Sequence, residues 1–212
     1  MKKYKAILFD VDGTLLDTSE GIISSVEYAI KEMGLDDIPY EVKKTFVGPP
    51  AQKSFQRVYG LSDEKAMEAA TLFRSQYGSV DFCKGKVYNG VVDLLQYLKD
   101  NGYKIGVATY KREDYAQKTI DAFNLTPYCE VVIGSDFAGK LTKADIIDIC
   151  IENLKTPKDE ILMIGDTEHD KTGAEKAGVD FLAVTYGFGF DKNYNEGLYA
   201  SSCEEIINML RG

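Results

Sequence analysis

Residues 5–14 read KAILFDVDGT, and this stretch decides the fold of the chain. Ala6 to Phe9 form a short apolar run ended by turn residues, which is typical of a strand buried on both faces of a sheet. Asp10 and Asp12 follow two residues apart, so in extended chain their carboxylates point the same way. At about 4 Å and an effective dielectric near 20, two like charges repel by roughly 4 kcal/mol. A hard cation or a shared proton would offset this repulsion, whereas a solvated, Asp-rich turn would need neither.

The composition limits the class of protein. The chain has 212 residues, enough for one large domain or a domain with a sizeable insertion. Its 25 Lys and Arg against 34 Asp and Glu give a formal net charge of −9, which argues against a nucleic-acid partner. No apolar run approaches the roughly 20 residues of a membrane helix, and the apolar core of the start, MKKYKAILFD, is too short for a signal peptide.

The cysteines indicate reduced thiols in a cytoplasmic protein. Cys83, Cys129, Cys150 and Cys203 lie far apart and form no C-x-x-C pair. A thiol nucleophile would need a histidine base, and His169 is the only histidine in the sequence. We place His169 at the surface near the site rather than among its ligands.

The middle of the sequence differs in pattern from its flanks. Between residues 15 and 82 the apolar residues recur at helical spacing, without a convincing strand. The predicted helices there span 20–33, 41–46, 51–59 and 62–78, with Ser62 as an N-cap. From residue 83 onward, strands alternate with helices, which is typical of a parallel sheet covered on both faces. The predicted strands span 104–109, 130–133, 161–164 and 181–184. The predicted helices begin near 91, 112, 142, 170 and 203, and Asp145 completes a capping box with Thr142.

One connection is far longer than a strand crossover requires. More than 90 residues separate Phe9 from Lys104, whereas a crossover needs about a dozen. Because the excess is helical, we predict an α/β core of residues 1–14 and 83–212, with a doubly wound parallel sheet, and a helical cap of residues 15–82. Ligands of such sheets bind outside the carboxyl ends of the strands, and a cap inserted after the first strand would lie at that edge.

The candidate functional residues all lie at or just after the carboxyl end of a predicted strand, so a parallel sheet would bring them to one edge. They are Asp10 and Asp12 after the first strand, Thr109 in VATYK, Lys143 in GKLTKAD, and Gly165, Asp166 and Asp170 in IGDTEHD.

This set of side chains has the chemistry of a phosphoryl-transfer site. Three carboxylates around an oxygen-rich site favour Mg²⁺, and no His or Cys cluster competes for zinc. Thr109 would donate to phosphate oxygens, and Lys143 would supply a positive charge. Taken singly, each has an ordinary alternative: a strand-end threonine, a solvated lysine that Lys140 could replace, or a turn-forming aspartate.

FDVDGTLLD, VATYK, Lys143 and IGDTEHD, in this order and spacing, together resemble the haloacid dehalogenase superfamily of hydrolases, in a subgroup with a helical cap. The resemblance implies that Asp10 is the nucleophile and forms an aspartyl-phosphate. It implies that Asp12 protonates the leaving oxygen and then activates water. It further implies Mg²⁺ held by Asp10, Asp166 and the backbone carbonyl of Asp12.

The same resemblance assigns the remaining site residues. Thr109 and Lys143 would bind the phosphoryl group, and Asp170 would orient Lys143 or a metal-bound water. Asp12 favours phosphate esters over halides, because an alkoxide leaving group needs a proton and a halide does not. Tyr110 stands where relatives often have Asn or Ser, which puts the local hydrogen bonding in doubt.

Two further stretches look like the phosphoglycolate-phosphatase-like subgroup, some of whose members are 5′-nucleotidases. They are VGPP at residues 47–50 and VTYGFG at residues 184–189. Gly48, Lys53 and Arg57 are candidate substrate contacts in the cap, although a helix breaker and a solvated helix face explain them equally well. We interpret Gly187 and Gly189 as a flexible loop near the site, because they do not match a dinucleotide fingerprint.

The sequence therefore predicts a Mg²⁺-dependent phosphatase for a small phosphorylated metabolite, such as phosphoglycolate, a sugar phosphate or a nucleotide. We expect a monomer or small homo-oligomer without a nucleic-acid or membrane partner. Three alternatives stay open: a 5′-nucleotidase, a phosphomutase of the β-phosphoglucomutase type, and a non-enzymatic phospho-acceptor signalling domain.

Overall fold

The structure is a computed structural model, and it describes residues 4–137 and 139–211. These residues form two compact units. The first runs up to Asp17 and resumes at Val87, and the second comprises Thr18–Lys86. The function of the second unit as a cap stays a prediction.

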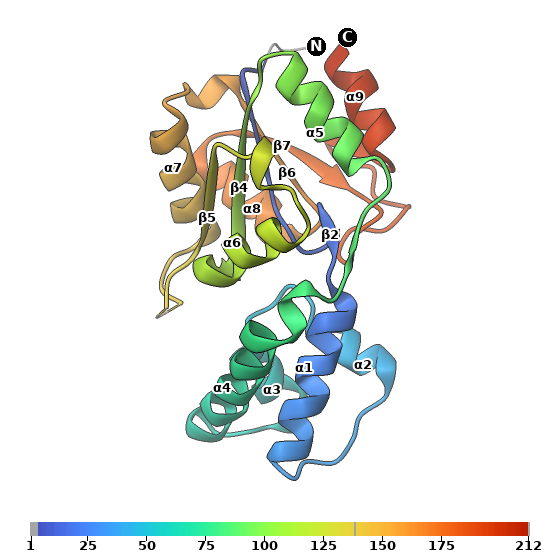
Figure 1. Cartoon of the computed structure of the whole chain (residues 1–212), viewed down its shortest axis with the longest axis vertical. Helices are drawn as coiled ribbons and strands as arrows, with labels where there is room; N and C mark the ends of the chain where they lie inside the picture. The colour runs from blue at the N-terminus through green and yellow to red at the C-terminus, as the bar shows by residue number, and fades with distance from the viewer. Residues whose placement is uncertain (1–3, 138, 212) are drawn as a thin grey trace. The chain divides into compact units, whose positions relative to one another are not determined.

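Among the described residues of the first unit, six parallel strands form one sheet in the order β5-β4-β1-β6-β7-β8. The predicted doubly wound α/β fold is confirmed (Figure 1). The order reverses beside β1, which pairs with β4 on one side and β6 on the other. This reversal makes the carboxyl end of β1 the expected ligand site of the sheet. The strands are β1 (Ala6–Phe9), β4 (Lys104–Arg112), β5 (Val131–Ser135), β6 (Ile161–Gly165), β7 (Asp180–Val184) and β8 (Leu198–Ala200).

Helices cover both faces of this sheet. They are α5 (Val91–Asp100), α6 (Glu113–Ala122), α7 (Lys143–Leu154), α8 (Glu168–Ala177) and α9 (Cys203–Arg211). Short 3₁₀ helices η2 (Thr126–Tyr128) and η3 (Lys158–Glu160) precede β5 and β6.

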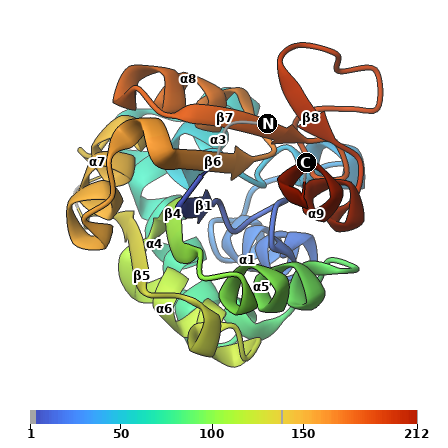
Figure 2. The ribbon, with the colours of Figure 1, turned by 90° about the horizontal axis from the view of Figure 1, so that it is seen from above.

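The side chains of β1 alternate between two hydrophobic cores. Ile7 and Phe9 pack into the core that α5 and α9 cover, and Ala6 and Leu8 pack into the core beneath α7 and α8 (Figure 2). All four side chains are at most 1% exposed. The apolar run of the sequence is thus a strand buried on both faces, which holds the residue that follows it at a fixed position.

Three features of this unit differ from the predicted elements. The sequence of β8 has no clear apolar pattern. This strand pairs in parallel with β7, and a hydrogen bond from the backbone N–H of Thr185 to the carbonyl of Ala200 extends the pairing. Strand β4 runs past Thr109 to Arg112, through an irregularity in its pairing with β5. Helix α8 begins at Glu168 instead of 170, because the Asp170 carboxylate accepts the backbone N–H of Thr167 at 3.0 Å and so caps the helix.

The second unit is helical, and its helices lie close to the predicted ranges. They are α1 (Ser19–Glu32), α2 (Tyr40–Lys44), α3 (Ala51–Tyr59) and α4 (Asp63–Ser79), followed by the 3₁₀ helix η1 (Asp81–Cys83). Ser62 accepts the backbone N–H of Lys65, as predicted for an N-cap. Two short strands that the sequence did not indicate, β2 (Leu16–Asp17) and β3 (Lys86–Val87), pair where the chain passes between the units.

Two findings bear on the predictions about compartment. The thiols of all four cysteines are unpaired. Among the described residues, each helix is too short or too polar to cross a lipid bilayer.

A buried carboxylate ties the two ends of the second unit together. Asp81 is fully buried and accepts from Ser25 Oγ at 2.8 Å and Gln76 Nε2 at 3.2 Å, while Lys84 Nζ lies 2.8 Å from its other oxygen. The backbone carbonyl of Asp81 lies directly against α1. A Cβ added at Gly21 would be 2.3 Å from that carbonyl oxygen, so only glycine fits there.

The Gly21→Ala variant tests this packing. Alanine in a helix interior is usually about 1 kcal/mol more stable than glycine. Here we expect the opposite sign, a loss of about 1–3 kcal/mol in the free energy of unfolding, because the methyl group must displace backbone. Urea unfolding measures the change, with Lys31→Ala on the exposed face of α1 as the control. A Gly21→Ala variant at least as stable as the parent would contradict the close approach.

Candidate active site

Asp10 occupies the switch point of the sheet. Its backbone N–H donates to the carbonyl of Ile164 at 3.0 Å, which extends the β1–β6 ladder by one bond. The side chain is buried, and its Oδ1 lies 2.7 Å from Lys143 Nζ. A carboxylate fixed in this way is oriented by backbone and by charge together.

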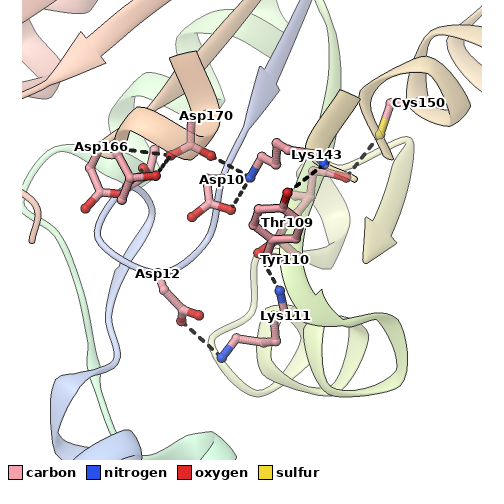
Figure 3. A network of polar contacts seen from close by, with 12 residues as sticks. Asp10, Asp12, Thr109, Tyr110, Lys111, Lys143, Cys150, Asp166 and Asp170 are labelled. Carbon is pink, nitrogen blue, oxygen red and sulfur yellow. Dashed lines mark hydrogen bonds and ion pairs between the residues drawn. The ribbon is translucent and has the colours of Figure 1, made fainter. Parts of the chain in front are cut away.

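Three buried carboxylates meet at this point. Oxygens of Asp10, Asp166 and Asp170 all lie within 4.8 Å of one another (Figure 3). Burial raises the pKa of Asp10 to about 6. The attraction of Lys143 opposes this shift, whereas the repulsion of Asp170 and Asp12 adds to it. Burial and the repulsion of Asp10 and Asp170 raise the pKa of Asp166 to about 8, although two backbone N–H donors oppose the shift.

This cluster fits a hard divalent cation. Oxygen-only ligands with excess negative charge are typical of Mg²⁺ sites. Of the predicted ligands, Asp10 and Asp166 lie in the cluster, with Asp170 as the third carboxylate. The side chain of Asp12 points elsewhere (Figure 3), so its predicted contribution through the backbone carbonyl stays a prediction.

Lys143 provides the positive charge of the cluster. Its Nζ lies 2.7 Å from Asp10 and 2.6 Å from Asp170, and the side chain is only 2% exposed. Burial lowers the pKa of this ammonium, but the two carboxylates outweigh burial and hold the pKa above its usual range. Lys143 is the first residue of α7, whose start is fixed by the predicted Thr142–Asp145 capping box. Lys140, the possible substitute, is exposed.

Asp170 performs two structural tasks at once. One carboxylate oxygen binds Lys143, and the other accepts from the backbone N–H of Thr167 at 3.0 Å and from its hydroxyl at 2.7 Å. Glycine is required beside it, because a Cβ at Gly165 would lie 2.5 Å from the Asp170 side chain. The glycine of IGDTEHD therefore makes room for the aspartate that orients Lys143.

Asp166 is held by the loop that we interpreted as flexible. Its Oδ2 accepts the backbone N–H of Phe188 at 2.7 Å and that of Gly189 at 3.3 Å. A Cβ at Gly187 would lie 2.5 Å from the same oxygen, and one at Gly13 would lie 2.1 Å from it. Gly13 also has a φ of +86°, which favours glycine. The interpretation as a flexible loop is wrong, since the loop glycines serve close packing on a site carboxylate.

Thr109 and Tyr110 lie beside the cluster, in the irregular stretch of β4 between Ala108 and Arg112. Thr109 is buried, and its Oγ1 accepts the backbone N–H of Lys111 at 3.2 Å. The hydroxyl of Tyr110 accepts the backbone N–H of Lys143 at 3.0 Å, and its ring meets the exposed His169 edge-on at 5.7 Å. Tyr110 thus supplies the local hydrogen bond that its unusual identity had put in doubt.

Sequence reasoning missed one charged residue at the site. Lys111 Nζ lies 3.0 Å from Asp12 Oδ1, and both side chains are largely buried. Lys111 is the last residue of VATYK, and a lysine two residues after a threonine that is predicted to end a strand looks like any solvated lysine. Only the pairing with Asp12 distinguishes it, and that pairing spans about a hundred residues of sequence.

The predicted cap contacts belong to the second unit. Lys53 and Arg57 are exposed on α3, and Gly48 lies in the loop before it with a φ of +98°. The guanidinium of Arg57 donates to the carbonyl and the hydroxyl of Thr45, at 2.9 and 2.8 Å, so it stabilises its own unit. Substrate contact by these three residues stays a prediction.

A buried aspartate at the switch point of a doubly wound sheet, with a lysine and further carboxylates around it, is the arrangement expected of a phosphoryl-transfer site. Residues 7–184 match the family model of haloacid dehalogenase-like hydrolases, so the chain belongs to this family.

Its relatives include named phosphatases. The chain is 34% identical, over 98% of its length and 94% of the relative, to a 5′-nucleotidase of Pseudomonas aeruginosa. It is 28% identical to a phosphoglycolate phosphatase of Aquifex aeolicus, over 87% of this chain and 86% of that one. The crystal structure of a predicted phosphatase from Clostridium acetobutylicum superposes with a TM-score of 0.90 at 35% identity, covering 99% of both chains. The chain is therefore a phosphatase of this family, which sets aside the non-enzymatic alternative.

The raised pKa values predict how the metal-free chain responds to pH. Asp10 and Asp166 keep their protons to higher pH when folded than when unfolded, where a carboxyl pKa is about 4. Between about pH 4 and 8 the folded state thus binds more protons, and its free energy of unfolding falls as pH rises. In EDTA we expect the free energy of unfolding to fall by several kcal/mol from pH 5 to pH 8, measured by urea unfolding.

Mg²⁺ should reverse this trend, because it binds the ionised carboxylates and so stabilises the fold more at pH 8 than at pH 5. The Asp166→Asn variant is the control, and in it both the pH slope and the Mg²⁺ effect should shrink. A metal-free chain whose stability rises over this range would contradict the repulsion within the cluster.

Proposed function

We propose that the protein is a Mg²⁺-dependent phosphatase of the cytoplasm that hydrolyses a small phosphomonoester through an aspartyl-phosphate. The observation that carries the proposal is the position of Asp10, buried at the end of the central strand with Lys143 at 2.7 Å and two further carboxylates around it. Asp10, Asp166 and the backbone carbonyl of Asp12 would hold Mg²⁺, with Asp170 close by. The bound ion would neutralise charge on the phosphoryl oxygens and allow an anionic nucleophile to approach them.

In the first step an oxygen of Asp10 attacks phosphorus in line with the ester bond. The bond between phosphorus and the ester oxygen breaks, and its electron pair stays on the leaving oxygen. Asp12 gives that oxygen a proton, which an alkoxide requires. Lys143 and the Thr109 hydroxyl stabilise the charge on the transferring group, because both are fixed at the same strand edge as Asp10.

In the second step water attacks the phosphorus of the aspartyl-phosphate. Asp12, now ionised, takes the proton from that water, and the bond between phosphorus and Asp10 breaks to release inorganic phosphate. Asp170 positions Lys143 throughout, since its other oxygen is fixed at the start of α8. The helical unit would close over this edge as a cap, exclude bulk water and select small substrates.

A phosphoglycolate-type ester is the first candidate substrate, on the strength of the subgroup resemblance and the phosphoglycolate phosphatase among the relatives. A 5′-nucleotide is the second, because the relative at 34% identity is named a 5′-nucleotidase. A phosphomutase would share the core but would retain the phosphoryl group on the sugar instead of releasing it.

Phosphate release from a panel of small esters tests this function. We expect release from the wild-type protein in Mg²⁺, none in EDTA, and a loss of at least about a thousandfold in kcat for Asp10→Asn, which lacks the nucleophile. Lys140→Met, which removes an exposed lysine near the site, is the control. Full turnover by Asp10→Asn would refute the covalent mechanism, and transfer of label between sugar positions without free phosphate would indicate a mutase.

The intermediate itself gives a second prediction. Asp12→Asn should slow hydrolysis of the aspartyl-phosphate by about a hundredfold or more, because no base activates water. Acid-quenched Asp12→Asn protein, mixed with 4-nitrophenyl phosphate, should therefore carry a phosphoryl group on Asp10 in peptide mass spectra. A phosphoryl group on any other residue would assign a different nucleophile.

A further inference from the structure

Lys111 is positioned by an irregular stretch of β4. Ala108 pairs with Ile133 and Arg112 with Ser135, so β4 uses two more residues than β5 over the same interval. Such bulges redirect side chains and are common beside active sites. A glycine on β5 permits this one, since a Cβ at Gly134 would lie 2.4 Å from the carbonyl oxygen of Lys111.

The bulge places the ammonium of Lys111 next to Asp12. Nζ lies 3.0 Å from Oδ1, and the side chain of Lys111 is only 6% exposed. Figure 3 shows Asp12 directed towards Lys111 and away from the three-carboxylate cluster. The proposed acid is therefore paired with a cation.

This ion pair constrains the substrate. Asp12 must direct its carboxyl group to the ester oxygen, which weakens its pairing with Lys111. Losing one partner of a largely buried ion pair is unfavourable unless another anion takes its place. A leaving alcohol that carries its own anion would supply that partner where the pair opens.

We propose that Lys111 is a specificity-determining residue that binds an anionic group carried by the leaving alcohol next to the ester oxygen. The inference rests on the proposed function and deepens it, because it names the substrate class as phosphomonoesters of small hydroxy acids. In 2-phosphoglycolate the carboxylate is attached to the carbon that bears the ester oxygen. The ribose of a 5′-nucleotide has no anion there, so the proposal separates the two candidate substrates.

The geometry explains why the anion must be near the ester oxygen. Asp12 gives its proton to that oxygen in the proposed mechanism, and Lys111 Nζ lies within hydrogen-bond distance of Asp12. Both residues belong to the core unit, so this selection does not depend on the position of the helical unit. No covalent bond changes, since the ammonium only exchanges one carboxylate partner for another.

The test compares two esters that differ in the anion alone, 2-phosphoglycolate and 2-hydroxyethyl phosphate. For the wild-type protein we expect kcat/KM to favour 2-phosphoglycolate by about ten- to a hundredfold, as for one charge-assisted hydrogen bond. Lys111→Met should bring this ratio to within about threefold of one, while Lys111→Arg should retain most of it.

The controls separate the possible results. Lys118→Met removes an exposed lysine on α6 and should leave the ratio unchanged. Urea unfolding establishes that each variant is folded, and Lys111→Gln replaces Lys111→Met if the latter does not fold. A wild-type ratio near one, or an equal loss on both esters in Lys111→Met, would overturn the proposal. If the wild-type protein releases no phosphate from any ester in Mg²⁺, the proposed function itself is overturned.

Discussion

Repulsion among three buried carboxylates is the constraint on which the rest of the core depends. Asp10, Asp166 and Asp170 meet within 4.8 Å, and a single ammonium, that of Lys143, lies among them. Burial, together with the repulsion that one positive charge leaves uncompensated, raises the pKa of both Asp10 and Asp166. The fold tolerates this arrangement because each carboxylate is held by separate elements, and the excess negative charge favours binding of a cation.

The backbone supplies most of this support. Asp10 follows a strand buried on both faces, Asp166 accepts N–H donors from the loop after β7, and Asp170 caps the helix that it begins. Each support needs room that side chains would occupy, and glycine provides it at Gly13, Gly165 and Gly187. Many of the chain's distinctive glycines are thus explained by one site. Changing any of them would move a carboxylate rather than merely loosen a loop.

The sequence predicts the structural features that depend on local pattern. It does not reveal those that depend on contacts between residues far apart in the chain. The buried run from Ala6 to Phe9 and the capping box before Lys143 follow from periodicity and spacing, and the structure has both of them. The bulge that positions Lys111 follows instead from pairing between β4 and β5, and no period in the sequence marks it. Gly187 and Gly189 looked flexible because their partner, Asp166, lies some twenty residues earlier.

Asp10 and Asp12 are two residues apart, yet different contacts hold their side chains. Asp10 is fixed by backbone pairing and a buried lysine, beside two neighbouring carboxylates, as suits the nucleophile that we propose it to be. The side chain of Asp12 is about as exposed as that of Asp10, at 12% against 11%, but Asp12 pairs with a lysine from another strand. A group that must give and take a proton at a moving oxygen needs a partner it can exchange. In the proposed mechanism the rigid cluster therefore serves any phosphomonoester, while the exchangeable pair of Asp12 and Lys111 distinguishes one leaving alcohol from another.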